Sequence, residues 1–162
     1  MNALAKAYHA SGVGSVFVYT HEAHPGEHYP HHDTFSRKLA HANAIRDVLG
    51  VDRPILVDGL DGACHQAFGA MPNMTWIVGR TGIPVYKSDW TDARSVANAI
   101  DYLIDVRDRR SQGGRLVPFR VERLDYRSAD RQAFFAGLER SGPKAVTEFA
   151  EFERGAGRPP AP

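Results

Sequence analysis

The chain has 162 residues, of which 43% are hydrophobic and 24% charged, so disordered and fibrous classes are excluded. Nineteen acidic side chains nearly cancel twenty basic ones, which predicts no partnership with nucleic acid or a membrane. The longest apolar runs are far too short to cross a bilayer. Cys64 is the single cysteine, so an intrachain disulfide and a C-x-x-C redox pair are excluded, and a cytoplasmic location is expected.

The first elements surround a loop that is rich in histidine. The spacing of Leu4, Ala5 and Tyr8 predicts a short helix. A β-branched and aromatic run over residues 15–20 predicts a buried strand, and two prolines and a glycine make residues 21–32 a loop. Chemistry is expected in and just after this loop, because six of the eight histidines lie there: His21, His24, His28, His31, His32 and His41.

A helix and a second strand are predicted next. Asp33 is expected to cap the helix and Gly50 to end it, and residues 54–58 read as another buried strand, followed by a short helix over 63–68. A strand, a helix and a strand in this order predict a right-handed parallel βαβ unit. The apolar line expected along the first helix consists of Phe35, Leu39, Ala42, Arg46 and Leu49, widened by Ile45 and Val48.

A hairpin and a long helix complete the first two thirds of the chain. Strands over 74–78 and 83–87 flank a glycine-containing turn, and Pro84 suits an edge strand because its missing N–H costs little there. Asp92 is expected to cap the long helix, which fades at Gly113.

The tail differs in composition from the rest. Residues 106–162 hold twelve basic and eight acidic side chains. Apolar residues at helical spacing predict two helices in the tail, with a break at Gly142-Pro143. The residues from 155 onward are expected to be a frayed end.

Four segments carry a resemblance to known proteins: VFVYTHEAHPGE (16–27), PILVD (54–58), AFGAMPNMTWIV (67–78) and VYKSDW (85–90). The order of elements resembles the later part of a thioredoxin-like redoxin domain, and the segments are similar to bacterial relatives of the iodothyronine deiodinases. The resemblance covers residues 1–105 and implies an α/β, thioredoxin-like sandwich with a parallel βαβ unit and a C-terminal β-hairpin. Residues 106–162 would form a helical, basic C-terminal extension.

The resemblance also shows a departure at the start of the chain. In this family a redox-active cysteine or selenocysteine sits at the N-terminus of the first active-site helix, after a central strand. Residues 2–9 look like the second half of that helix, so the first strand and the nucleophile are expected to be missing. If the nucleophile is selenocysteine, its codon reads as a stop, and Met1 would be the next apparent start. The chain as written is therefore expected to be weak or inactive in catalysis.

Three residues near the predicted strand end are implied to be catalytic: Glu22, His24 and His41. The resemblance suggests that His24, beside Glu22, faces the active site, where an imidazole could stabilise a thiolate or selenolate and relay protons. His41 matches the second site histidine of the family. Two simpler interpretations stay open: His24 could bind only loop backbone, and His41 could be a packed or solvated helix histidine.

Substrate contacts are implied at Tyr19, Met71 and Pro72. Pro72 matches the redoxin proline whose preceding peptide bond is cis, a geometry that would expose the Met71 backbone to a substrate. The alternative is a loop proline that starts a strand. Cys64, near a helix start, is interpreted as a buried structural cysteine, with a substitute nucleophile or resolving thiol as the minor alternative.

The resemblance implies a thiol- or selenol-dependent oxidoreductase that carries out reductive dehalogenation, or peroxide or disulfide reduction. It would act on a small-molecule or thiol substrate and be regenerated by a cellular thiol reductant, with no cofactor and no metal. The alternative is a non-catalytic binding module, which could hold a metal through the loop from His21 to His32. Because prolines prevent this loop from forming a helix, the spacing of its histidines does not itself define a ligand geometry.

Overall fold

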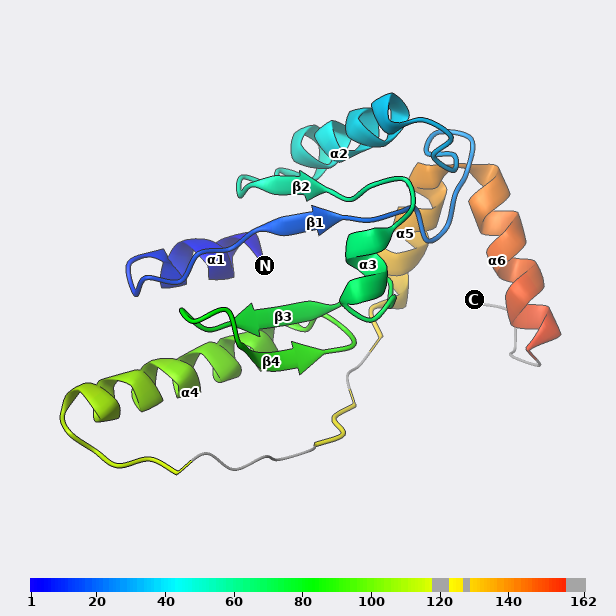
Figure 1. Cartoon of the computed structure of the whole chain (residues 1–162). Helices are drawn as coiled ribbons and strands as arrows, with labels where there is room; N and C mark the ends of the chain where they lie inside the picture. The colour runs from blue at the N-terminus through cyan, green and yellow to red at the C-terminus, as the bar shows by residue number, and fades with distance from the viewer. Residues whose placement is uncertain (118–122, 127–128, 157–162) are drawn as a thin grey trace. The chain divides into compact units, whose positions relative to one another are not determined.

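The computed structural model is a mixed α/β structure with two small sheets (Figure 1), and it describes residues 1–117, 123–126 and 129–156. The chain divides into two compact units, each made of two stretches of sequence. One unit comprises Met1–Val16 with Met71–Arg127, and the other comprises Phe17–Ala70 with Ser128–Pro162. These units do not follow the predicted boundary at residue 105, because the tail helices belong to the same unit as residues 17–70.

The second unit contains the predicted βαβ arrangement. Strand β1 (Phe17–Tyr19) pairs in parallel with β2 (Ile55–Val57), and helix α2 (Phe35–Leu49) connects the strands and packs against β2 (Figure 1). The prediction of two buried strands is wrong. Val18 and Leu56 are paired in the register and stay exposed, because alternate residues of a strand point to opposite faces and α2 packs on only one of them.

Helix α2 begins and packs differently from the prediction. Thr34, not Asp33, is its N-cap and accepts a hydrogen bond from the Arg37 N–H, while Asp33 pairs with the Arg37 guanidinium at 2.7 Å. The helix ends at Gly50, as predicted, in the left-handed conformation with φ of 60°. The predicted apolar line is wrong, since Phe35, Leu39, Val48 and Leu49 are exposed and the buried residues are Lys38, His41 and Ala42.

Burial of polar side chains on α2 is possible because they have partners. The Lys38 ammonium donates to the Gly59 carbonyl at 2.7 Å, and His41 lies 3.0 Å from a ring nitrogen of His32. A buried polar group with a hydrogen-bond partner costs far less than an unpaired one. The buried face of α2 is therefore the one whose polar side chains have hydrogen-bond partners, and the more apolar face is exposed.

Helix α3 (Ala63–Ala67) follows β2 and is held by a buried carboxylate. Asp58 is 5% exposed and accepts hydrogen bonds from the backbone N–H groups of Cys64 at 3.0 Å and His65 at 2.9 Å. Burial alone would raise the pKa of Asp58, but these donors, the Gly59 N–H and the charge of Lys38 outweigh it and lower the pKa. Asp58 therefore fixes the start of α3 in its ionised form.

The tail helices α5 (Arg131–Ser141) and α6 (Pro143–Gly155) pack against each other. They meet at the predicted break, where Gly142 has φ of 122° and Pro143 opens α6. Glu153 is 3% exposed and pairs with Arg131 at 3.1 Å. The predicted frayed end lies largely outside the described residues, because α6 continues to residue 155 and residues 157–162 are not described.

The first unit holds helix α1 (Asn2–His9), the strands β3 (Thr75–Val78) and β4 (Pro84–Ser88), and helix α4 (Ala93–Ser111). The two strands form the predicted antiparallel hairpin, and Asp92 caps α4 as predicted by accepting from the Ser95 N–H at 2.8 Å. Tyr8 of α1 donates to Asp101 of α4 at 2.6 Å.

The expectation of a cis bond before Pro72 is wrong, since the described residues contain no cis peptide bond. A trans bond is the intrinsically favoured state by about 0.5–1 kcal/mol. The unusual backbone geometry lies just before Pro72, where Gly69 has φ of 111° and Ala70 has φ of 57°.

Hydrophobic burial is limited in this structure. Among the described residues no large side chain is fully buried, and no helix is both long and apolar enough to pass through a bilayer. The buried apolar residues are small in number: Tyr19, Ala42, Val51, Val96, Ile100, Leu138 and Ala145.

Candidate functional site

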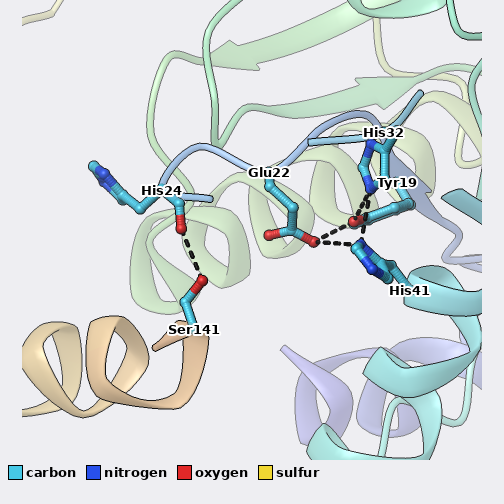
Figure 2. A network of polar contacts seen from close by, with 6 residues as sticks. All are labelled: Tyr19, Glu22, His24, His32, His41 and Ser141. Atoms are coloured by element: carbon cyan, nitrogen blue, oxygen red, sulfur yellow. Dashed lines mark hydrogen bonds and ion pairs between the residues drawn. The ribbon is translucent and has the colours of Figure 1, made fainter. Parts of the chain in front are cut away.

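Four side chains meet where strand β1 ends. Tyr19 is the last residue of β1, Glu22 follows it in the loop, His32 lies further along the same loop, and His41 comes from α2 (Figure 2). The Tyr19 hydroxyl donates to the Glu22 carboxylate and lies 2.9 Å from Nε2 of His32. His32 Nε2 is also 3.0 Å from Nδ1 of His41, which in turn lies 3.6 Å from Glu22 Oε1. These four residues are called the polar network below.

The polar network combines side chains from strand β1, the loop that follows it and helix α2. Tyr19 is 4% exposed and His41 is 8% exposed, so both lie on the rigid part of the unit. His32 is edge-on to the Tyr19 ring at 5.4 Å and to the His41 ring at 4.9 Å, and the Tyr29 ring stands at 5.4 Å from His41. The contact between rings restricts their rotation, so the nitrogen and oxygen atoms keep facing one another.

Burial controls the charges of the network. Burial, followed by the hydrogen bond to Glu22, raises the pKa of Tyr19 well above its usual range, so the hydroxyl keeps its proton. Burial, followed by the nearby charges of His41 and Lys38, lowers the pKa of His32 to about 4. At neutral pH His32 is therefore neutral and Tyr19 keeps its proton.

A pocket of about 240 Å³ opens beside His32. Four imidazoles and one ammonium lie around it, and no carboxylate is among its lining residues. Burial, followed by the charges of His65 and Lys38, lowers the pKa of His21, whose ring centroid is 4.8 Å from that of His65. The cationic and imidazole residues of the lining are His21, His31, His32, Lys38 and His65.

The tail helices hold the loop that carries the site residues. The Ser141 hydroxyl at the end of α5 donates to the His24 carbonyl at 2.9 Å (Figure 2), and the His28 N–H donates to the Ser141 carbonyl at 3.0 Å. Glu27 accepts from the Lys144 N–H in the first turn of α6 at 3.0 and 3.1 Å. This carboxylate caps a helix that lacks a cap of its own, and the bonds lower the pKa of Glu27.

His24 lies outside the polar network. Its ring stands edge-on to Phe134 and Phe149, with centroids at 5.5 Å in both cases, and Figure 2 shows its ring directed away from Glu22. Burial lowers the pKa of His24. In this structure the side chain contacts the tail helices, whereas its backbone carbonyl accepts from Ser141.

The other predicted residues are distributed as follows. Glu22, His41 and Tyr19 come together in the polar network. Met71 and Pro72 belong to the other unit and are exposed. Cys64 is half-buried in α3, and it is not among the residues that line the pocket.

Sequence reasoning did not find the roles of His32, Lys38 and Ser141. His32 was grouped with the loop histidines, but it alone of that group joins Glu22 and His41 among the described residues. Gly26 was a signal for the role of the tail, since an added Cβ would meet the Ser141 backbone. That signal can only be interpreted once the partner is known.

Comparison with known proteins gives no relative. No family model matches the chain, no curated protein matches it, and no solved structure matches its fold. Function must therefore be argued from the residues themselves.

Proposed function

We propose that this chain provides the proton-transfer and substrate-holding part of a thiol- or selenol-dependent oxidoreductase with a thioredoxin-like architecture. The observation that carries the proposal is the polar network, in which a tyrosine, a carboxylate and two imidazoles contact one another at the carboxyl end of a parallel strand. Loops at this end of parallel strands are where α/β proteins place their reacting groups. The similarity of the segment VFVYTHEAHPGE to deiodinase relatives supports the same conclusion.

The chemistry needs a proton that the network can deliver. In peroxide reduction, a thiolate or selenolate attacks one peroxide oxygen, the O–O bond breaks, and the departing alkoxide takes a proton from His41. The sulfur or selenium is oxidised to the sulfenic or selenenic acid, and two thiols then reduce it and become a disulfide. In reductive dehalogenation the nucleophile takes the halogen as a cation and becomes a sulfenyl or selenenyl halide, and the carbanion left behind receives the proton. Two thiols then release the halide and regenerate the nucleophile as they become a disulfide.

The proposal needs a cysteine or selenocysteine nucleophile, which the resembled family carries at the start of the helix that residues 2–9 resemble. Cys64 is a poor substitute, because it is not among the residues that line the pocket. The Lys38 ammonium, in a lining that contains no carboxylate, favours a small substrate that carries negative charge.

The test uses the chain extended by the residues encoded directly upstream, with cysteine at any in-frame UGA codon. We expect thiol-dependent peroxidase or dehalogenase activity to appear only in the extended chain. Within it, His41→Gln is expected to lower kcat about 100-fold, because it removes a proton donor. His28→Gln is the matched control, since this histidine of the same loop is exposed and is not one of the four residues of the network.

Two results would refute the proposal. An upstream frame without a hydrophobic strand followed by a cysteine or UGA codon would remove the nucleophile. An active extended chain in which His41→Gln and Glu22→Gln retain full kcat would show that the polar network does not transfer protons.

A further inference from the structure

The polar network has an unusual arrangement of hydrogen-bonding atoms. Nε2 of His32 lies within hydrogen-bond distance of both the Tyr19 hydroxyl, at 2.9 Å, and Nδ1 of His41, at 3.0 Å. An imidazole nitrogen has one in-plane site, which holds either a proton or a lone pair. It therefore makes one well-directed hydrogen bond, and a second partner at the same distance shares it poorly. The Tyr19 hydroxyl and the His41 nitrogen therefore compete for the single in-plane site of His32 Nε2.

The distances between these atoms suit a small divalent ion. One ligand atom from each of Glu22, His32 and His41 lies within 4.8 Å of the other two. Bond lengths of about 2.0–2.2 Å to zinc place tetrahedral ligands about 3.3–3.6 Å apart. The separation of 3.0 Å between the histidines lies just below that range, and the 3.6 Å between His41 and Glu22 lies at its upper end. Rotation of the three side chains would bring them into three of the four positions.

We propose that Glu22, His32 and His41 form a binding site for a divalent transition-metal ion of the zinc type. Two imidazoles and one carboxylate are a ligand set that zinc prefers, whereas Ca²⁺ and Mg²⁺ prefer sets built from oxygen. The set is distinct from the metal site first considered for the loop, because it combines one loop histidine with the Glu22 carboxylate and with His41 of helix α2. Its fourth position is left to a water or to a small anion.

The surroundings of the three ligands support this assignment. Tyr19 donates its hydroxyl proton to Glu22 and so orients the carboxylate, as groups around metal ligands commonly do. His41 is 8% exposed on helix α2, which makes it the rigid ligand, while His32 lies on the more exposed loop. His32 also lines the pocket, which provides a route from solvent to the site.

Metal binding and proton transfer by the network exclude each other. A metal ion would occupy the same nitrogen lone pairs that carry protons in the proposed redox reaction. The metal site does not depend on that reaction, however, because it requires only the three ligands and is detected by binding itself. Failure of the redox proposal would therefore leave the metal site intact.

The test measures binding of Zn²⁺ to the chain by competition with a chromogenic chelator, and of Co²⁺ by its visible absorption spectrum. We expect one ion per chain, a tetrahedral or five-coordinate Co²⁺ spectrum, and a rise in unfolding temperature when Zn²⁺ is added. His32→Gln and Glu22→Gln are each expected to weaken Zn²⁺ binding about 100-fold or more, and Tyr19→Phe about 10-fold. His28→Gln, in the same loop, should bind as the original chain does.

Three outcomes would overturn the proposal. The first is no stoichiometric binding of either ion by the chain. The second is affinity unchanged in His32→Gln and Glu22→Gln. The third is equal loss in His28→Gln, which would show unspecific binding by the loop histidines. Should His41→Gln unfold the chain, the loop variants keep the test valid, because His32 and Glu22 are more exposed and their circular dichroism can be compared with that of the original chain.

Discussion

Replacing Gly26 with alanine should detach the histidine-bearing loop from the tail helices. Gly26 is buried, and a Cβ built on it would lie 2.7 Å from the carbonyl carbon of Ser141 and closer still to its oxygen. Because both atoms belong to backbone, the clash cannot be relieved by rotating a side chain. The loop and the end of α5 must instead move apart.

The size of the effect follows from the contacts at this junction. Separation would break the bond from the His28 N–H to the Ser141 carbonyl, the bond from the Ser141 hydroxyl to His24, and the bond from the Lys144 N–H to Glu27. Three bonds at about 0.5–1.5 kcal/mol each amount to roughly 1.5–4.5 kcal/mol. Alanine restores about 0.4–1 kcal/mol by reducing the entropy of the unfolded chain. We therefore expect a net loss of about 0.5–4 kcal/mol in the free energy of unfolding.

The assay is urea unfolding followed by far-UV circular dichroism, together with amide exchange of the His28 N–H. Both tryptophans, Trp76 and Trp90, lie in the other unit, so their fluorescence reports separately on that unit. Gly137→Ala is the matched control, because this position of α5 has open space around its Cβ and alanine should stabilise the helix there by about 0.5–1 kcal/mol. If Gly26→Ala unfolds within 0.5 kcal/mol of the original chain, at about the scatter of a surface substitution, and leaves His28 protected, the loop does not rest on α5 as described.

Three further predictions concern the same unit. Asp58→Asn should be less stable than the original chain near neutral pH, and the difference should shrink as the pH falls below about 4. The reason is that the pKa of Asp58 is lower in the folded chain than in the unfolded chain, so the stability it contributes is present above the unfolded pKa and is lost as the carboxylate is protonated. Unfolding curves between pH 7 and pH 2.5 measure this, and a constant difference would contradict it. Arg131→Ala should lower the free energy of unfolding by about 2 kcal/mol, which is less than the full cost of breaking a buried ion pair because Arg131 is 48% exposed. In urea unfolding, the double variant Arg131→Ala with Glu153→Gln should recover part of this loss. His24→Phe should keep the stability of the chain, whereas His24→Ala should lower the free energy of unfolding by about 1 kcal/mol, because the aromatic contact with the tail is lost. Equal stability of the two variants in urea unfolding would show that the ring does not pack there.

Local signals predicted the elements of the chain well. Gly50 ends α2 because glycine adopts the left-handed conformation readily, and Asp92 caps α4 because its carboxylate reaches an N–H three residues ahead. The hairpin over β3 and β4 and the break at Gly142 depend in the same way on neighbours in the sequence. These interactions span only a few residues, so their pattern can be recognised without knowing the rest of the fold.

The candidate site was predicted only in part. Glu22, His41 and Tyr19 were selected by resemblance, and the structure brings them together. His32 could not be distinguished from its neighbours, because a loop without regular periodicity gives no indication of which side chains face inward. His24 illustrates the same limit, since its environment comes from phenylalanines more than a hundred residues away.

The sequence by itself determined where several helices and turns begin and end, such as the start of α4 at Asp92 and the end of α2 at Gly50. The tertiary structure alone decided which face of α2 is buried, which histidine joins Glu22 and His41, and that the tail holds the loop. The physical reason is that capping and turn formation depend on contacts within a few residues, whereas the burial of a polar side chain depends on a partner. For Ser141 and His24 that partner is 117 residues away, and only folding brings the two together.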